Sequence, residues 1–318
     1  MSPFLSHPIL SKNFSHLKIE IVTCGDDDGY ESSHHHQQQE QEQKEPSPHI
    51  VVVTLNRIRK RNAINRIMWR EIGEIFSILG RIGDDCRAVI LTGAGTKAFT
   101  SGIDISDPEL MMVSSDDPND DVARKGMAFL PKVLDMQRCF TAIEECPVPV
   151  IAVIQGSCIG AGIDIASVCD IRLCTRTAQF SVREVKIGLA ADVGTLQRFP
   201  KITGNDSRVR ELCLTGEMFT AQEALRIGFV SRICSNSDTI MEDAVKLAKV
   251  IAANSPVAVM GTKRSLVYSR DHSVSEGLDH IATHNTCAIM SDDIPTAMIS
   301  SKQKKTARFS RIPKLSKL

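Results

Sequence analysis

Three carboxylate side chains stand among apolar residues in the middle of this 318-residue sequence: Asp164, Glu184 and Asp192. A carboxylate surrounded by Val, Ile, Leu and Ala carries a large desolvation cost unless it is paired or has a chemical role. Two carboxylates with different pKa values can serve as general acid and general base in one reaction. The pattern therefore indicates that these three carboxylates are either paired or functional. Taken singly, Asp192 could instead be a helix N-cap, and Glu184 an ion-pair partner of Arg183 or Lys186.

The first of these carboxylates follows a segment that is typical of a buried strand leading into a helix. Val150–Ile154 is an apolar run of strand length. A Gly-rich turn around Ala161 then precedes the apolar residues that surround Asp164. A helix that begins at this turn leaves unpaired N–H groups and the positive end of its dipole there. We therefore expect the turn to stabilise developing negative charge.

A second Gly-rich loop follows the predicted strand at residues 88–92. The pattern Gly-x-Gly-x-x-Ala that starts at Gly93 has the spacing of a dinucleotide-binding fingerprint. That fingerprint requires an uninterrupted helix, whereas residues 99–108 contain Gly and Pro. The pattern favours instead a loop whose backbone N–H near Ile103 points into a site. Asp104 could act in catalysis, although a loop Asp more often caps local N–H groups.

Composition excludes several classes of function. The chain has 38 basic and 38 acidic residues and only 4% aromatic residues, which argues against a nucleic-acid surface. Ten Cys without a C-x-x-C pair indicate free thiols in a reducing compartment. No His lies between His49 and His272, so we expect neither a His-based triad nor a metal site there. No apolar run reaches transmembrane length, and the first residues lack a signal-peptide pattern.

The chain divides into four segments by composition and periodicity. Residues 1–16 are predicted to be a loose N-terminal arm and residues 17–250 an α/β core. Residues 17–22 and 49–55 are predicted to pair as strands, and the insertion at 25–47 between them contains three consecutive His. The His could bind metal, but the composition favours a solvated low-complexity segment. Residues 251–300 are predicted to be helical, and residues 301–318 form a basic tail.

Helical periodicity and end signals predict the main helices. They are residues 64–79, 122–145, 239–253, 256–268 and 280–300. Further strands are predicted at 171–174 and 229–233, and a capping box is predicted at Thr220 and Glu223. Asp170, at the end of the helix that carries Asp164, is predicted to pair with backbone or with an Arg.

Residues 17 to 300 resemble the enoyl-CoA hydratase/isomerase (crotonase) superfamily, and within it the Δ3,5-Δ2,4-dienoyl-CoA isomerases. The resemblance is carried by residues 55–57, 60–63, 99–104, 158–164, 184–185, 188–198, 255–259 and 268–273. The acid at position 192 is the most specific of these features, because it is absent from ordinary hydratases of the superfamily. The resemblance implies a spiral of ββα units followed by a C-terminal helical trimerisation region, and a homo-trimer or homo-hexamer.

The resemblance also implies a fatty acyl-CoA thioester as substrate, with no cofactor beyond the coenzyme A it carries and no metal. The thioester oxygen would lie between the backbone N–H groups of Ile103 and Ala161, the second of which is usually Gly in the family. Asp164, Glu184 and Asp192 would be the catalytic acids, with Asp164 where hydratases carry a Glu. Substrate binding is expected at Lys60, Arg61, Ala63, Ser101, Gly102, Ile103, Asp104, Ile105 and Gly162, and Ile58 replaces a common Pro.

The implied reaction converts a 3,5-dienoyl-CoA to a 2,4-dienoyl-CoA. We expect Glu184 to take the C2 proton, Asp192 to serve C6 and Asp164 to tune the site, although the sequence does not decide the order. A plain enoyl-CoA hydratase, a non-catalytic member that binds acyl-CoA or RNA, and a structural oligomer are the alternatives. Intact acids and neutral net charge argue against the last two.

The chain ends in Ser316, Lys317 and Leu318. This tripeptide at a carboxyl end is read by the peroxisomal import receptor. We therefore expect a peroxisomal protein, with no nucleic-acid partner and no membrane span.

Overall fold

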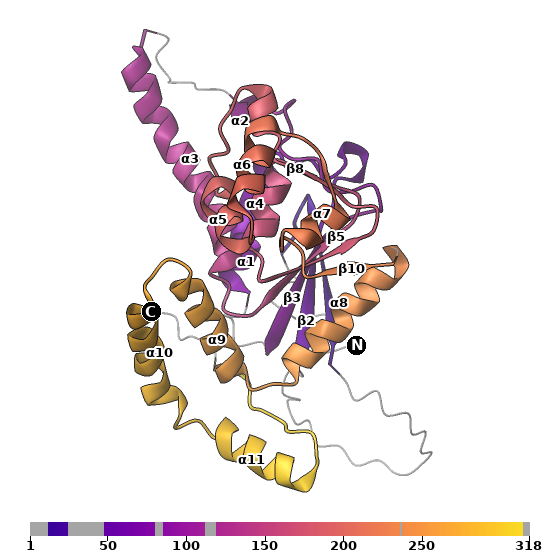
Figure 1. Cartoon of the computed structure of the whole chain (residues 1–318), viewed down its shortest axis with the longest axis vertical. Coiled ribbons are helices and arrows are strands. Elements are labelled where there is room, and N and C mark those ends of the chain that lie inside the picture. Colours follow the sequence, from indigo (N-terminus) through magenta and orange to yellow (C-terminus); the bar gives the residue numbers. More distant parts are fainter. Residues whose placement is uncertain (1–11, 25–47, 80–84, 112–118, 236, 314–318) are drawn as a thin grey trace.

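The computed structural model describes residues 12–24, 48–79, 85–111, 119–235 and 237–313. Within them the chain forms an α/β fold built on two sheets (Figure 1). The larger sheet comprises, in spatial order, β1 Leu17–Thr23, β2 His49–Leu55, β3 Cys86–Gly93, β5 Val150–Ile154, β7 Ile171–Thr175 and β10 Arg232–Cys234. The smaller sheet comprises β4 Ala98–Thr100, β6 Ser157–Ile159, β8 Gln179–Ser181 and β9 Phe219–Thr220.

Each turn of the chain adds one strand to the larger sheet and then one to the smaller sheet. β3 is followed by β4, β5 by β6 and β7 by β8, and within each sheet these strands pair in parallel. A helix follows each pair: α3 Val122–Glu144, α4 Ala161–Val168 and α5 Thr195–Ile202. This repetition confirms the predicted spiral of ββα units. Because parallel strands end at the same edge of a sheet, the loops after β4, β6 and β8 come together.

The central strands β2, β3 and β5 of the larger sheet are buried on both faces. In β3, Val89 and Leu91 belong to one apolar cluster, whereas Ala88 and Ile90 belong to another. This division follows the two-residue period of a strand. The first cluster contains α1 Arg66–Ile78 and α3, and the second contains α8 Ser237–Ala252, which packs across the opposite face. Covering helices on both faces explain why these strands read as continuous apolar runs.

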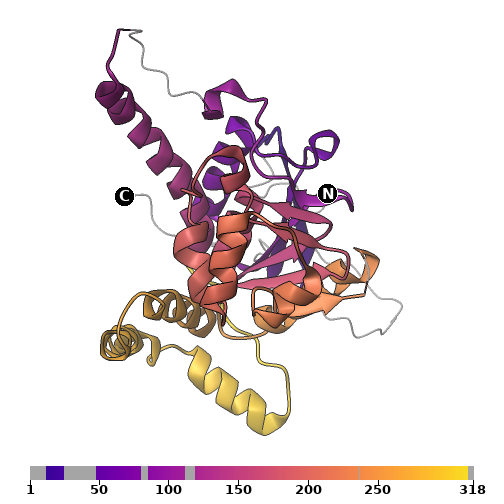
Figure 2. The same ribbon diagram turned by 45° about the horizontal axis from the view of Figure 1, so that its top comes forward.

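The remaining helical elements are short or lie outside the sheets. They are η2 Ile58–Lys60, α2 Pro108–Met111, η3 Glu184–Ile187, α6 Asp206–Thr215, α7 Ala221–Arg226, α9 Pro256–Ser269, α10 Val274–Ala288 and α11 Asp293–Gln303. In two views α9, α10 and α11 lie beyond the sheets as a separate arm (Figures 1 and 2). The predicted C-terminal helical region is therefore present.

Most predicted elements are confirmed, with three corrections. The predicted strand at 229–233 begins too early, because β10 starts only at Arg232. The predicted helix at 280–300 is wrong: α10 ends at Ala288, and α11 begins only at Asp293. The predicted capping box is also wrong, because Thr220 caps α7 but the Glu223 carboxylate is held by Arg208 and Arg226. A reciprocal capping box is found instead at the start of α10.

The described part of the predicted N-terminal arm is tied to the core. Glu71 of α1 accepts hydrogen bonds from the backbone N–H of Ser15 at 2.5 Å and of His16 at 2.9 Å. β1 and β2 pair antiparallel from Leu17 opposite Leu55, as predicted. Residues 1–11 and the low-complexity insertion lie outside the described residues.

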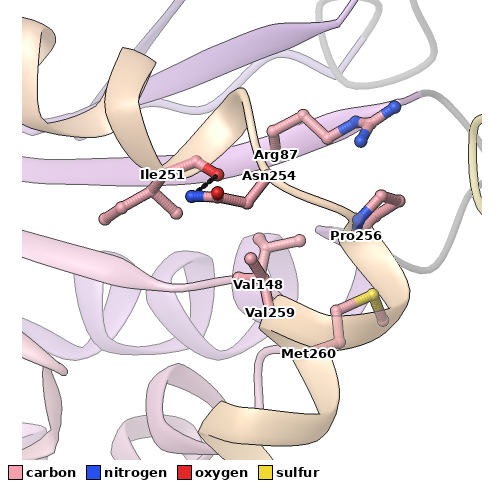
Figure 3. Close-up of a pocket in the computed structure, with 7 residues that line it drawn as sticks. All are labelled: Arg87, Val148, Ile251, Asn254, Pro256, Val259 and Met260. Atoms are coloured by element: carbon pink, nitrogen blue, oxygen red, sulfur yellow. Dashed lines mark hydrogen bonds between the residues drawn. The ribbon is translucent and has the colours of Figure 1, made fainter. Parts of the chain in front are cut away.

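The C-terminal tail returns to the core beside a small cavity. Arg87 of β3 donates a hydrogen bond to the Phe309 carbonyl at 3.0 Å. Arg87 also lines a cavity of about 10 Å³, together with Val148 and residues of the α8–α9 junction (Figure 3). That volume holds at most about one water molecule. We therefore regard this cavity as a packing gap and not as a ligand site.

No single described helix is both long and apolar enough to cross a membrane. Thr239–Ala252 and Pro256–Ser269 satisfy the length and composition criteria only as a pair bent by 108°.

Close packing of α1 on α3 yields a test of the fold. A Cβ on Gly73 would lie 2.8 Å from Cys139 Sγ and 3.1 Å from Cys139 Cα, so we expect Gly73→Ala to lower the free energy of unfolding by about 1–3 kcal/mol. Gly126 of α3 has nothing within 4 Å of its Cβ position, so Gly126→Ala should instead stabilise by about 0.4–1 kcal/mol. Urea unfolding followed by circular dichroism measures both, and equal values for the two variants would contradict this packing.

Candidate functional site

The turn from β6 into α4 places Glu184 beside the first residue of the helix. Gly160 adopts φ +55°, which favours glycine, and α4 begins at Ala161. A Cβ on Gly160 would lie 3.3 Å from Glu184 Oε1, so the carboxylate of Glu184 packs directly against this turn. The Ala161 N–H is in the first turn of α4 and therefore has no acceptor within the helix. A charged group and an unpaired donor thus lie side by side.

The loop after β4 reaches the same turn. Gly102 adopts φ +93°, and a Cβ there would lie 2.9 Å from the Ile159 carbonyl and 3.8 Å from the Ala161 nitrogen. Ile64 donates to the Gly102 carbonyl at 2.8 Å and accepts from the Asp104 N–H at 2.9 Å. Neighbouring N–H groups of an extended chain point in alternate directions. The Ile103 N–H, which lies between these two hydrogen bonds, therefore faces away from Ile64.

The N–H groups of Ile103 and Ala161 therefore belong to two adjacent backbone segments. Two such donors can hold one carbonyl oxygen and stabilise an oxyanion. The methyl group of Ala161 leaves its N–H in place. The structure places the segments of Ile103 and Ala161 next to each other, as an oxyanion hole requires. Their joint role as that oxyanion hole stays a prediction.

Asp164 is the most deeply buried of the three predicted acids. Only 1% of the surface of this residue is exposed to solvent. Oδ1 accepts hydrogen bonds from the Thr195 N–H at 2.6 Å and from the Thr195 hydroxyl at 2.7 Å, whereas Oδ2 has no partner among the described residues. The pKa of Asp164 is raised to about 7, mainly by burial; the hydrogen bond from the Thr195 hydroxyl opposes this rise, and the charge of Glu184 adds to it.

Glu184 opens η3 and is half-buried. Burial raises the pKa of Glu184, and the nearby charge of Asp192 raises it further. Its Oε2 has no hydrogen-bond partner in the described part of the chain. The side chains of Arg183 and Lys186 are exposed, and neither forms a recorded ion pair with it. The ion-pair alternative for Glu184 is therefore not realised.

Asp192 lies on the turn that leads into α5. The N-cap of α5 is Gly194 at φ +132°, so the N-cap alternative for Asp192 is wrong. Gln137 of α3 donates to the Asp192 carbonyl at 2.6 Å and ties this turn to α3. Burial raises the pKa of the Asp192 carboxyl.

The structure thus brings the three predicted acids within electrostatic reach of one another. The charges of Glu184 and Asp192 both raise the pKa of Asp164. Adjacent carboxylates in a poorly solvated site cannot all ionise readily, so they titrate as a coupled group. Near neutral pH such a group can contain both a base and an acid, as proton transfer requires.

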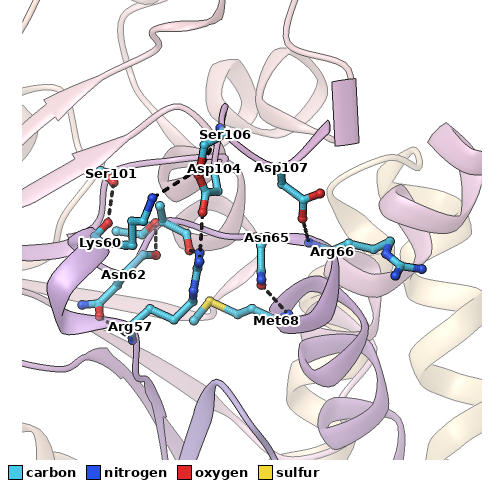
Figure 4. A network of polar contacts seen from close by, with 12 residues as sticks. Arg57, Lys60, Asn62, Asn65, Arg66, Met68, Ser101, Asp104, Ser106 and Asp107 are labelled. Carbon is cyan, nitrogen blue, oxygen red and sulfur yellow. Dashed lines mark hydrogen bonds and ion pairs between the residues drawn. The ribbon is translucent and has the colours of Figure 1, made fainter. Parts of the chain in front are cut away.

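The loops predicted to bind substrate are joined by a polar network (Figure 4). Asp104 pairs with Arg57 at 2.9 Å and accepts a hydrogen bond from the Ser106 N–H at 3.1 Å. Its side chain therefore caps the loop, which was one of the two predicted roles. The Lys60 ammonium lies 3.3 Å from the Ser106 hydroxyl, and Ser101 donates to the Lys60 carbonyl at 3.4 Å.

The other predicted binding residues differ in their exposure. Arg61 is exposed at φ 50°, Ile105 is 73% exposed and Ala63 is buried. Gly162 is buried, and a Cβ there would lie 2.8 Å from Thr100 Cγ2, so its visible role is close packing of α4 on β4. Substrate contacts of all these residues stay predictions.

Sequence reasoning missed three residues that position the site: Thr195, Gln137 and Arg57. Thr195 holds Asp164, Gln137 holds the turn of Asp192, and Arg57 pairs with Asp104. A buried carboxylate without a local partner was the only available signal that such donors must exist.

Other groups do not compete with this site. A hollow of about 420 Å³ lies between α9 and α10, lined by Tyr268, His280 and neighbouring polar residues, and it contains none of the three acids. Among the described residues, no group of three His, Cys, Asp or Glu side chains is arranged to hold a metal ion.

Comparison with known proteins agrees with this arrangement. Residues 45–311 match the family model described as enoyl-CoA hydratase/isomerase. This chain belongs to the enoyl-CoA hydratase/isomerase family. Family members of known structure share its fold: an enoyl-CoA hydratase from Bacillus anthracis superposes with a TM-score of 0.72 at 28% identity, covering 83% of this chain and 96% of that chain.

Two family members named as isomerases are similar over most of their length. The mitochondrial Δ3,5-Δ2,4-dienoyl-CoA isomerase of Rattus norvegicus is 48% identical over 267 residues, which cover 84% of this chain and 80% of the rat protein. The peroxisomal Δ3,5-Δ2,4-dienoyl-CoA isomerase of Arabidopsis thaliana is 38% identical, over 83% of this chain and 92% of the plant protein.

The raised pKa of Asp164 predicts a specific pH dependence of stability. Between the ordinary value of 3.8 and about 7, the native protein binds a proton that the unfolded chain releases, so stability falls as pH rises. We expect Asp164→Asn to remove this loss of stability with rising pH. Chemical unfolding at pH 4 and pH 8 should show the variant gaining up to about 4 kcal/mol relative to wild type at the higher pH. A pH-independent difference would contradict a protonated Asp164.

Proposed function

We propose that this protein is a Δ3,5-Δ2,4-dienoyl-CoA isomerase. The observation that carries the proposal is the clustering of a third acid, Asp192, with Glu184 and Asp164 beside the turn at Ala161. Relatives named for this activity are up to 48% identical to the chain, which supports the assignment.

The chemistry requires two separate carboxyl groups. A proton leaves C2 of the 3,5-dienoyl thioester, the two double bonds shift, and a proton arrives at C6. Glu184 accepts the C2 proton and Asp192, in its protonated form, delivers the C6 proton. Each returns to its starting state by proton exchange, so atoms and charge balance over the cycle. Asp164, whose pKa is raised to about 7, holds a proton in a large fraction of molecules near neutral pH and so limits the negative charge between the two.

The intermediate is a dienolate whose charge rests mainly on the thioester oxygen. The N–H groups of Ile103 and Ala161 stabilise it, and each such donor contributes on the order of 3 kcal/mol. The exposed Arg61 and the neighbouring Lys60 lie at the entrance to the loop of Ile103, where they can bind coenzyme A phosphates. No further cofactor is needed, because the thioester itself supplies the electron sink.

Hydration of an enoyl-CoA is the second candidate, because the superposed Bacillus anthracis protein is named a hydratase. Hydration needs two acids that flank a water molecule. Here Asp164 is shorter than Glu and is already held by Thr195, and Asp192 adds an acid that hydration does not use. Crotonyl-CoA hydration distinguishes the two activities.

The decisive test removes the acid at position 192. With 3,5-octadienoyl-CoA, wild type should generate the ultraviolet absorbance of the conjugated 2,4-dienoyl product. Asp192→Asn should lower kcat by about 10²–10⁴-fold, because the general acid is lost. Asp206→Asn, which alters an exposed ion pair with Arg210, is the matched control and should retain wild-type turnover. Full turnover by Asp192→Asn would refute the assignment.

We also propose assembly through the C-terminal helices into a trimer or hexamer. Val274 and Met290 are more than 80% exposed, and Leu266, Leu278 and Met298 are each more than 60% exposed. Large exposed apolar side chains gathered on these helices are consistent with an association surface. Analytical ultracentrifugation measures the assembly directly.

We propose a peroxisomal location on the basis of Ser316, Lys317 and Leu318, which lie outside the described residues. The named relatives include both mitochondrial and peroxisomal proteins. A fusion with a fluorescent protein at the N-terminus should enter peroxisomes, and deletion of the last three residues should leave it in the cytosol. Mitochondrial fluorescence that persists after the deletion would contradict the proposal.

A further inference from the structure

A buried charge cluster connects the C-terminal helices to the turn that carries Asp192. Its centre is Glu144, near the end of α3, which is 8% exposed. Glu144 binds Arg198 of α5, with Nη2 and Oε2 3.0 Å apart, and Arg270 at the end of α9, with Nη1 and Oε1 2.6 Å apart. Burial alone would raise the pKa of Glu144, but the hydrogen bonds from Arg270 and Arg198 hold it below its ordinary value.

Arg198 also touches the backbone of the catalytic turn. A Cβ on Gly194 would overlap Arg198 Nη1, so the guanidinium lies directly over this glycine. Gly194 separates Asp192 from Thr195, whose N–H and hydroxyl hold Asp164. The position of one guanidinium therefore affects the turn that carries Asp192 and, through Thr195, the support of Asp164.

Arg270 determines where that guanidinium can lie. Arg270 and Arg198 share the two oxygens of Glu144, and each oxygen has a guanidinium partner. Without Arg270, the second oxygen would be a buried acceptor with a weaker partner, since Arg198 Nε is 3.3 Å away. Arg198 would shift toward it, because a buried carboxylate oxygen without a good hydrogen bond is costly. Such a shift changes the contact between the guanidinium and Gly194.

We propose that Arg270 is a positioning residue that, through Glu144 and Arg198, holds the turn between Asp192 and Thr195 in its reactive place. The position of α9 and α10 relative to the core then controls proton delivery by Asp192. This inference rests on the proposed isomerase activity. It gives the C-terminal helices a role in the reaction in addition to their role in assembly.

Loss of Arg270 should impair only the second half of the reaction, the delivery of a proton to C6. Among the described residues, the side-chain hydrogen bonds and ion pair of Arg198 go to Glu144 and Thr141, and none goes to Glu184, Ile103 or Ala161. Arg270→Gln should therefore still remove the C2 proton but deliver the C6 proton poorly. A misplacement of about 1 Å can cost about 10²-fold in rate, so we expect kcat to fall about 10–100-fold. KM should stay within about threefold of wild type.

The test compares two measurements on 3,5-octadienoyl-CoA in deuterated water. Ultraviolet absorbance follows isomerisation, and nuclear magnetic resonance follows deuterium entry at C2 of unreacted substrate. Arg270→Gln should lose isomerisation while C2 exchange persists, and Arg270→Lys should recover part of kcat. Lys201→Gln is the matched control, because it removes an exposed ion pair with Asp271 that joins the same elements. It should behave as wild type.

Sedimentation and thermal unfolding establish that each variant is assembled and folded. If Arg270→Gln does not fold, Arg198→Lys is used, since it keeps a charge partner for Glu144 but lacks the planar group that covers Gly194. Unchanged kcat in the folded variant, or equal loss of exchange and isomerisation, overturns the inference. Absence of isomerisation by wild type would overturn the proposed function itself, which distinguishes the two failures.

Discussion

Mutual repulsion among three carboxyl groups is the constraint on which this site depends. Asp164, Glu184 and Asp192 lie where water is scarce, so ionising all three is costly. Thr195 supplies two donors to one oxygen of Asp164 and none to the other. The protein thus keeps one acid oriented and able to hold a proton, which leaves a base and an acid for chemistry.

The fold surrounds these three acids with rigid backbone. Loops after successive parallel strands meet at one edge, and glycines with positive φ at 102 and 160 allow these loops to approach closely. In the proposed reaction, the backbone donors at Ile103 and Ala161 would need no flexible side chains, so little reorganisation would accompany charge development. The network of Arg57, Asp104 and Ser106 keeps the first loop in place (Figure 4).

The C-terminal helices have two distinct kinds of surface. They carry several large exposed apolar side chains, among them Val274 and Met290, which suit contact with further copies of the chain. Their inward contact, by contrast, is made by buried charge, at Arg270 and at Lys263, which binds Asp170 at 2.7 Å. Asp170 also accepts the Val150 N–H at 2.7 Å, so the predicted pairing with backbone is confirmed, whereas its ionic partner is Lys and not Arg. Charged contacts fix orientation more strictly than apolar ones, which is consistent with a positioning role.

The sequence alone determined most strands of the larger sheet, most helices and the three acids, because apolar periodicity and carboxylates in apolar surroundings are local signals. It also suggested the backbone turns at Ile103 and Ala161. It did not predict the short strands β4, β6 and β9 of the smaller sheet. Only the tertiary structure decided which donors hold these groups. Thr195 lies 31 residues from Asp164, and Arg198 lies 54 residues from Glu144, so no local pattern relates them. The N-cap reading of Asp192 was wrong because packing placed Gly194 at that position, and capping preferences are weaker than tertiary contacts.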